Sequence, residues 1–439
     1  MADDESRPRR TSSEARTRRG ARVAAESGDA SSISRGRKPD DGMRGTLEGK
    51  GRGDRSFSGI RSLTNPLWCY HGFRIVVVIL TCFGVVMVFS SSTVSLISSG
   101  QSPWKQALSQ SLYCVIGLAV GFAAMHVSVE GYRRITFVLL IIALLAQLLT
   151  MTGLGVSVNG NSGWIAIGPV TAQPAEFMKL VLCLWLPKAL GASAKTYPTQ
   201  GAKAFAMPAG VFALCLGTVL LGKDLGTALI IIAIGVVAFL LSGFPMRWFL
   251  AISAVLVAVI GVFVVTSPNR MKRIFAAYQT CTSEQAQQVC YQAIHAKYAM
   301  ASGGLLGVGI GNSKEKWNYL PEAHNDFIFA IIGEETGFVG AAAVILLFVI
   351  MGWCLVVVAL QTRDSYASMV LLCITTWIVG QGLVNVMVVV GLFPVMGVPI
   401  PFVSAGGSSL IMCLTAAGVA VSMMRRQSQI HDYVTALSS

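Results

Sequence analysis

The residues best suited to chemistry lie between Trp317 and Gly340, in the stretch WNYLPEAHNDFIFAIIGEETGFVG. Asp326 is followed there by Phe327 and several isoleucines, and no basic residue adjoins it in the sequence. Desolvation in such surroundings raises the pKa of a carboxyl group, which suits a general base that works near neutral pH. Asp326 is therefore the first candidate for a catalytic residue. The alternative is a carboxylate that caps the following helix.

Two further carboxylates, Glu334 and Glu335, follow in the same stretch. In a helix they lie about 12 Å deeper than Asp326, so they cannot act on the same atom. A buried carboxylate needs a partner. We expect one of the two to pair with Lys179 or with another basic group inside the protein.

Two acid–base pairs occur in or beside other apolar segments. Glu176 and Lys179 are three residues apart, so they share one helix face and can neutralise each other. Lys223 and Asp224 precede an apolar segment, where the carboxylate can cap the helix. Charged groups inside a membrane are costly, which makes each a functional candidate. A structural ion pair and a helix cap are the competing interpretations.

An uncharged stretch near the C-terminus, GLFPVMGVPIPFVSAGGSS at 391–409, contains three prolines and four glycines. It leads into an apolar segment through a turn of small residues, where backbone N–H groups can bind an anion. Close packing of helices explains the glycines equally well.

Neither a metal site built by the protein nor a nucleotide site is predicted. His324 is one of five histidines, and none of them has metal-ligand spacing to a second histidine or cysteine. Gly307, Gly309 and Gly311 are not followed by the GK[ST] of a phosphate-binding loop. Any reaction must therefore draw its energy from the substrate.

Membrane helices must position these residues. Of the 439 residues, 54% are hydrophobic and 13% are charged, a composition that water-soluble globular proteins do not have. A helix needs about 20 apolar residues to cross a bilayer. We predict an all-α, polytopic integral membrane protein with about ten transmembrane helices, at roughly 73–97, 108–128, 135–153, 175–194, 203–221, 225–243, 247–266, 326–360, 366–392 and 406–424.

The net charge of +13 is unevenly distributed, because residues 1–70 hold 15 of the 34 basic residues. This stretch has few residues that build a core and no apolar segment that resembles a signal peptide, so we expect a disordered basic tail. The basic residues lie in the tail and in short loops, which does not indicate nucleic-acid binding. By the positive-inside rule, both termini are cytoplasmic.

Three regions follow from this topology: the tail 1–70, a membrane domain 71–425 and a short cytoplasmic tail 426–439. The long loop 267–325, between helices seven and eight, lies outside the cell. We expect it to be structured, with residues 298–311 as a re-entrant or interfacial element packed on protein. Eight of the ten cysteines lie in or beside apolar runs, whereas Cys281 and Cys290 share this outer loop and can form a disulfide.

Four motifs, in order, resemble those of the SEDS family (shape, elongation, division and sporulation), the polytopic peptidoglycan polymerases of bacteria. The resemblance covers roughly residues 70–425, and the wording around Asp326 together with the long basic tail is most similar to the cell-division members. The motifs are NGNSGWIAIGPVTAQPAEFMKL at 159–180, KDLGTAL at 223–229, SGGLLGVGIGNSKEKWNYLPEAHNDFIFAIIGEETG at 302–337 and the stretch 391–409.

The resemblance implies an enzyme that polymerises lipid II into glycan strands at the division septum and releases undecaprenyl diphosphate. It implies a class B penicillin-binding transpeptidase as partner, and the basic tail is expected to bind other divisome proteins. Asp326 inherits the catalytic role, in which it deprotonates a sugar 4-hydroxyl. Trp164, Gln173, Glu176 and Lys179 are expected to line the central cavity.

Other residues are candidates for holding the substrate. Arg270, Arg273 and Lys316 are expected to stabilise the leaving diphosphate, either alone or with a divalent cation, Mg²⁺ or Mn²⁺. The remaining candidates for substrate binding are His324, Glu334, Glu335, Ser404, Gly406 and Ser408.

Two rival functions remain open. A lipid II flippase would use Glu176 and Lys179 to handle the head group, but the chain has no convincing inverted repeat, and the position of Asp326 near the outer face also argues against it. A non-catalytic divisome scaffold would tolerate the loss of Asp326, whereas a polymerase would not.

Overall fold

The computed structural model describes residues 59–158, 161–168, 170–266, 271, 274, 278, 290–317 and 319–438. These residues all belong to the unit Phe57–Ser439. Most of the predicted tail lies outside them, as do Arg270, Arg273 and Cys281. The expectations for those residues therefore stay predictions.

Each of the ten predicted ranges contains an apolar helix. Seven helical segments among the described residues are long and apolar enough to cross a membrane, and one of these, Pro174–Leu221, joins two helices through the short 3-10 helix η2 (Gly201–Phe205). The helices are α1 (Pro66–Ser98), α2 (Lys105–His126), α3 (Val129–Leu149), α4 (Pro174–Gln200), α5 (Ala206–Leu221), α6 (Leu225–Leu241), α7 (Met246–Val265), α11 (Ile328–Gln361), α12 (Ser365–Val389) and α13 (Gly407–Met424). The prediction of a helical, polytopic membrane protein is confirmed.

Polar side chains mark where several helices begin. Asn65, Ser128, Asp224 and Asp364 are the N-caps of α1, α3, α6 and α12, and each side chain accepts a hydrogen bond from a backbone N–H of the first turn. Asp224 is thus a helix cap, one of the two interpretations that the sequence allowed. The first helix starts at Pro66, after the 3-10 helix η1 (Gly59–Thr64), which is earlier than the predicted boundary at residue 71.

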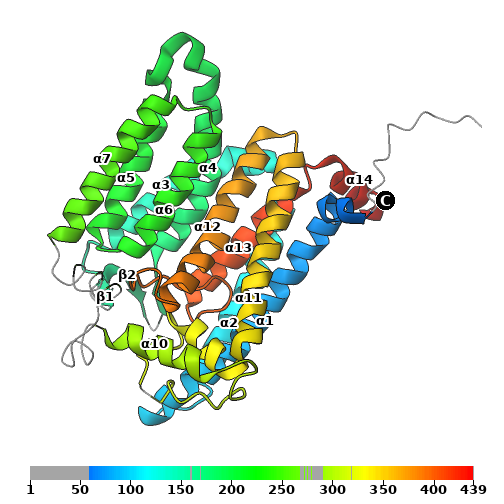
Figure 1. Cartoon of the computed structure of the whole chain (residues 1–439). Coiled ribbons are helices and arrows are strands. Elements are labelled where there is room, and N and C mark those ends of the chain that lie inside the picture. The colour runs from blue at the N-terminus through cyan, green and yellow to red at the C-terminus, as the bar shows by residue number, and fades with distance from the viewer. Residues whose placement is uncertain are drawn as a thin grey trace, which may run out of the picture. The chain divides into compact units, whose positions relative to one another are not determined.

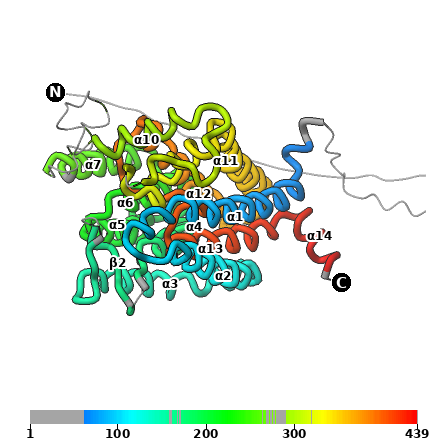
Figure 2. Tube along the Cα trace, turned by 90° about the horizontal axis from the view of Figure 1, so that it is seen from below, coloured from blue at the N-terminus to red at the C-terminus, as the bar shows by residue number. Residues whose placement is uncertain are grey.

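Helices α4, α12 and α13 lie near the middle of the bundle (Figures 1 and 2). Helix α4 contacts α3, α6, α12 and α13, and Trp377 of α12 is completely buried. Large apolar side chains on α2, α3 and α7, among them Leu112, Phe137 and Val257, are exposed. Because lipid is as apolar as a protein interior, exposed apolar helix faces are expected in a membrane protein.

A small antiparallel sheet is the element that the sequence analysis missed. Its strands are β1 (Gly155–Val158), β2 (Asn161–Ile167) and β3 (Val170–Ala172), in the order β1-β2-β3. The strands are short and lie in an uncharged segment between two helices, which the prediction left as a loop. Ser162 N donates a hydrogen bond to Gly222 O, so the sheet is attached beside Asp224.

The two ends of the bundle differ in chemistry. Figure 1 shows α10 (Tyr291–Ser302) and the sheet at one end, which we call the α10 end, and α14 (Ser428–Ser438) near the other, the α14 end. At the α14 end, Arg133 forms an ion pair with Asp364 at 2.6 Å, and Arg426 pairs with Glu130. These arginines are ones that the sequence analysis placed in cytoplasmic loops.

Helix α11 is interrupted at Gly337, where φ is 69° and ψ is −169°. The segment that follows α10 fills the interruption with backbone hydrogen bonds. Val308 N donates to Glu334 O at 3.0 Å, and Phe338 N donates to Gly304 O at 2.9 Å. The predicted element within 298–311 is therefore packed on protein, against α11.

Glycines allow this close approach. A Cβ atom on Gly303 would lie 1.9 Å from Gly333 O, and one on Gly307 would lie 2.2 Å from Glu335 O. Gly307 also has a positive φ of 81°. The helix and the docked segment can meet only because side chains are absent at these positions.

The cysteines divide as predicted in the described part of the chain. Eight are free, and most of these are buried. Cys290 is disulfide-bonded, whereas Cys281, its predicted partner, lies outside the described residues.

Gly307→Ala should destabilise the protein more than Gly311→Ala. Both glycines have positive φ, 81° and 89°, which costs an alanine about 1–2 kcal/mol. Only Gly307 has backbone within 4 Å of the added Cβ on the described residues, so the difference in thermal unfolding between the variants measures the clash. Equal losses would show that the segment does not dock on α11 as described.

Candidate active site

Asp326 lies in the turn directly before α11, at the α10 end, and its side chain is half-buried. The N-cap of α11 is Phe327, without a side-chain capping bond. The alternative interpretation of Asp326 as the cap of this helix is therefore wrong. Its Oδ2 lies 3.5 Å from where a Cβ on Gly397 would be, so the carboxylate faces the backbone of the segment between α12 and α13.

That segment, residues 390–406, holds the turn by its backbone. Ala405 N donates to His324 O at 2.9 Å, and the Ser404 hydroxyl donates to Asn325 O at 2.8 Å. The Asn385 side chain, on α12, donates to Asp326 O at 2.7 Å. Three consecutive carbonyls of the turn are thus bonded, and the position of Asp326 depends on all three.

Glu176 and Lys179 form the predicted ion pair, with Lys179 Nζ 2.8 Å from Glu176 Oε1 and both side chains at most 2% exposed. Lys179 Nζ also donates to Gln381 Oε1 at 2.8 Å and lies 5.1 Å from the centre of the Trp377 ring. The hydroxyl of Ser409 donates to Glu176 at 3.3 Å. The pair therefore joins α4, α12 and α13 in the centre of the bundle.

Gln173 lies beside this pair and reaches the start of α6. Its Nε2 donates to Asp224 Oδ2 at 2.6 Å, and its backbone N–H donates to the Ser408 hydroxyl at 3.4 Å. Trp164 is half-buried on β2, paired in register with Val156. The structure thus brings Gln173, Asp224 and Ser408 together, at the start of α4, α6 and α13.

Ser404 and Gly406 are occupied within the protein. Besides its bond to Asn325 O, the Ser404 hydroxyl accepts from Ile400 N at 2.8 Å, and Gly406 N donates to Gln110 Oε1 at 3.5 Å. Of the two interpretations of the stretch 391–409, close packing is the one that these contacts favour.

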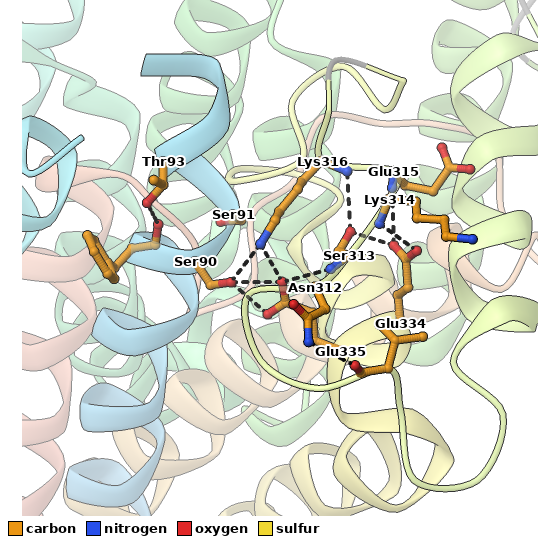
Figure 3. A network of polar contacts seen from close by, with 12 residues as sticks. Ser90, Ser91, Thr93, Asn312, Ser313, Lys314, Glu315, Lys316, Glu334 and Glu335 are labelled. Atoms are coloured by element: carbon orange, nitrogen blue, oxygen red, sulfur yellow. Dashed lines mark hydrogen bonds and ion pairs between the residues drawn. The ribbon is translucent and has the colours of Figure 1, made fainter. Parts of the chain in front are cut away.

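Glu335 is buried in a polar network at the α10 end (Figure 3). Its carboxylate lies 2.9 Å from Lys316 Nζ, accepts from the Ser90 hydroxyl of α1 at 2.7 Å, and accepts from Ser313 N at 3.4 Å. The expected basic partner is therefore Lys316 rather than Lys179. Since Lys316 is 4% exposed and neutralises Glu335, we withdraw the expectation that it stabilises a leaving diphosphate.

Glu334 belongs to the same network (Figure 3). It accepts from the Ser313 hydroxyl at 2.5 Å and from Lys314 N at 2.9 Å. Both carboxylates are 1% exposed and turn toward the docked segment. They fasten that segment to α11 and do not face a substrate, which corrects their expected role in substrate binding.

Strained backbone occurs beside the polar residues of this end. Among the described non-glycine residues, positive φ is found at Lys223, Glu322 and Phe402. Lys223 adjoins Asp224, Glu322 lies in the turn of Asp326, and Phe402 lies in the segment that holds this turn. Such strain persists only where the surrounding structure enforces it, and it clusters at functional sites.

No group of three or more His, Cys, Asp or Glu that could hold a metal ion occurs among the described residues. A divalent cation at this site would therefore take most of its ligands from a bound diphosphate and from water. Asn385, Gln381 and Gln110 are the residues that sequence reasoning missed. The available signal was two amides four residues apart in the apolar run of α12.

Together these features define a polytopic helical membrane protein with an acidic turn at one end. Comparison then identifies the family: residues 70–429 match the model of the FtsW/RodA/SpoVE cell cycle proteins, and the chain belongs to this family. It is 32% identical to a probable peptidoglycan glycosyltransferase FtsW of Mycobacterium tuberculosis, over 84% of this chain and 70% of that protein. It is 33% identical to stage V sporulation protein E of Bacillus subtilis, over 80% and 95%.

Solved structures agree with this assignment. The chain resembles the rod shape determining protein RodA of Thermus thermophilus with a TM-score of 0.59 and 26% identity, over 82% of this chain and 97% of that one. It also resembles a chain of a peptidoglycan synthase complex that coordinates polymerization and crosslinking, with a TM-score of 0.66 and 26% identity, over 82% and 98%.

Lys316→Met should lower the free energy of unfolding by about 3–5 kcal/mol, because it leaves the buried Glu335 carboxylate without its cation. The added change Glu335→Gln should restore part of the loss. Lys314→Met, two residues away and exposed, should cost no more than about 0.5 kcal/mol. Similar losses at both lysines, measured by thermal or denaturant unfolding, would contradict the buried pair.

Acidification should destabilise the protein through His324. Burial lowers the pKa of His324 below its usual value, and the Glu322 carboxylate partly opposes this effect. The unfolded chain therefore binds this proton more tightly, so stability present above pH of about 6.5 is lost as the pH falls through the folded pKa. Unfolding of His324→Gln should depend less on pH in this window; an unchanged dependence would refute the assignment.

Proposed function

We propose that this protein is a peptidoglycan glycosyltransferase that polymerises lipid II during cell division. The observation that carries the proposal is Asp326, held by three backbone hydrogen bonds in a turn at the α10 end. Curated relatives named as probable peptidoglycan glycosyltransferases support the reaction class. Division rather than sporulation is supported by the wording around Asp326 and by the basic tail.

In the proposed topology all ten apolar helices cross the membrane and both termini are cytoplasmic. This arrangement places the arginine-rich α14 end inside, in accord with the positive-inside rule, and Asp326 outside. Lipid II that has crossed the membrane would then present its sugars at the level of Asp326. We locate the protein in the inner membrane at the division septum.

The proposed reaction begins when the carboxylate of Asp326 accepts the proton of the 4-hydroxyl on an incoming lipid II. The sugar oxygen attacks C1 of the donor sugar on the growing strand, and a glycosidic bond forms. The bond between C1 and the diphosphate oxygen breaks, and undecaprenyl diphosphate leaves with the electron pair. Arg270 and Arg273 are proposed to stabilise this leaving group, with or without a divalent cation. Trp164, Gln173 and Ser408 are proposed to contact the sugars.

The proposed partner is a class B penicillin-binding transpeptidase, which would crosslink the strands. A similar chain belongs to a synthase complex that coordinates polymerization and crosslinking, which supports this pairing. The flippase alternative is weaker, because Glu176 and Lys179 are bonded to each other and at most 2% exposed. Groups that are satisfied in the protein interior are poorly placed to carry a head group.

Asp326→Asn should abolish glycan-strand formation from purified lipid II, by at least about 100-fold, because the amide cannot accept the proton. The assay uses the full chain with its transpeptidase, at matched expression and melting temperature. Glu315→Gln is the control, since it removes a carboxylate from the same loop that pairs with His295. Polymer from Asp326→Asn at the normal rate would remove the base assignment. Polymer from neither protein would favour the flippase or scaffold.

A further inference from the structure

The backbone that carries Asp326 is held by side chains from two different elements. His324 O, Asn325 O and Asp326 O accept from Ala405 N, the Ser404 hydroxyl and Asn385 Nδ2, at 2.9, 2.8 and 2.7 Å. Neither Asn385 nor Ser404 reaches the reaction through a contact of its own carboxylate or base. We propose that Asn385 and Ser404 are positioning residues, which fix the direction of the Asp326 carboxylate for catalysis.

Asn385 has a geometry that suits this role. Its side chain is 2% exposed and uses both amide hydrogens, one on Asp326 O at 2.7 Å and one on Val398 O at 2.6 Å. A single planar group thus bridges the turn and the facing segment. Because Gly397 adjoins Val398 and lies against Asp326 Oδ2, the bridge sets the distance between the carboxylate and the backbone opposite it.

The oxygen of the same amide supports this role. Asn385 Oδ1 is buried and has no hydrogen-bond partner in the described part of the chain. An unsatisfied buried acceptor is destabilising, so an apolar side chain of similar volume would pack better here. The amide therefore costs stability at this position, and what it supplies is its two donors. A group that weakens the fold while fixing one turn is expected where function requires that turn.

Ser404 completes the arrangement from the other side. Its hydroxyl accepts from Ile400 N and donates to Asn325 O, both at 2.8 Å, so its hydrogen has one defined direction. Phe402 nearby has a φ of 66°. The segment is thus held in an uncommon conformation while it bonds the turn, as expected for a preorganised site.

The inference rests on the proposed function, because a positioning role needs Asp326 to act in catalysis. The test compares Asn385→Leu and Ser404→Ala with wild type, as the full chain with its transpeptidase and purified lipid II. We expect kcat to fall by about 10- to 100-fold, because a carboxylate displaced by about 1 Å loses that much rate. KM should stay within about twofold, since neither residue is proposed to bind lipid II.

Ser422→Ala is the matched control. Its hydroxyl also donates to a backbone carbonyl, Val127 O at 2.7 Å, and it is similarly buried, but it lies at the α14 end. This variant loses the same kind of bond and should keep its kcat. Melting temperatures of all variants report whether a loss of rate comes from a loss of folded protein.

The outcomes separate the two proposals. A normal kcat in Ser404→Ala and in folded Asn385→Leu, with Asp326→Asn inactive, would overturn positioning and leave the glycosyltransferase intact. A rise in KM with unchanged kcat would also overturn it, because that result indicates substrate binding. If Asn385→Leu does not fold, Ser404→Ala decides alone. Normal activity in Asp326→Asn would overturn both proposals together.

Discussion

Backbone N–H and C=O groups that leave regular helices at membrane depth must find partners inside the protein, because lipid offers none. The α10 end of this molecule is built around that constraint. At the break in α11 the carbonyls of Glu334 and Glu335 accept from Val308 and Gly309 of the docked segment. In the turn before α11, the three carbonyls from His324 to Asp326 accept from other elements. Irregular backbone and function occur together here because only a well-bonded framework permits the irregularity.

Much of the fold could be predicted from the sequence because its determinants are local. Apolar runs of sufficient length gave the helices, and the spacing of Glu176 and Lys179 gave their pairing on one face of α4. The short strands of the sheet were missed, since four or seven residues between helices carry little periodic pattern. The glycines near 307 were recognised as a break in a packed element, but not as the contact surface for α11.

The site could be predicted only in part, because its partners are distant in the sequence. Asp326 was found from its apolar surroundings. Its supporting groups, Asn385 and Ser404, lie 59 and 79 residues away and act through backbone carbonyls, which leave no trace in residue types. Lys316 was misassigned for a related reason. A lysine in a loop resembles a ligand for phosphate until the fold places it, as here, against Glu335 and Ser90.

The same reasoning explains how two groups of charges with different depths are tied to one segment. Gln381 and Asn385 lie one turn apart on α12 and donate to Pro399 O and Val398 O, which are adjacent carbonyls. Gln381 also accepts from Lys179, whereas Asn385 holds Asp326 O. A displacement of the buried Glu176–Lys179 pair would therefore reach the acidic turn through two amides and one peptide. In this arrangement the charges that look most catalytic by sequence are the supports, and the half-buried Asp326 is what they support.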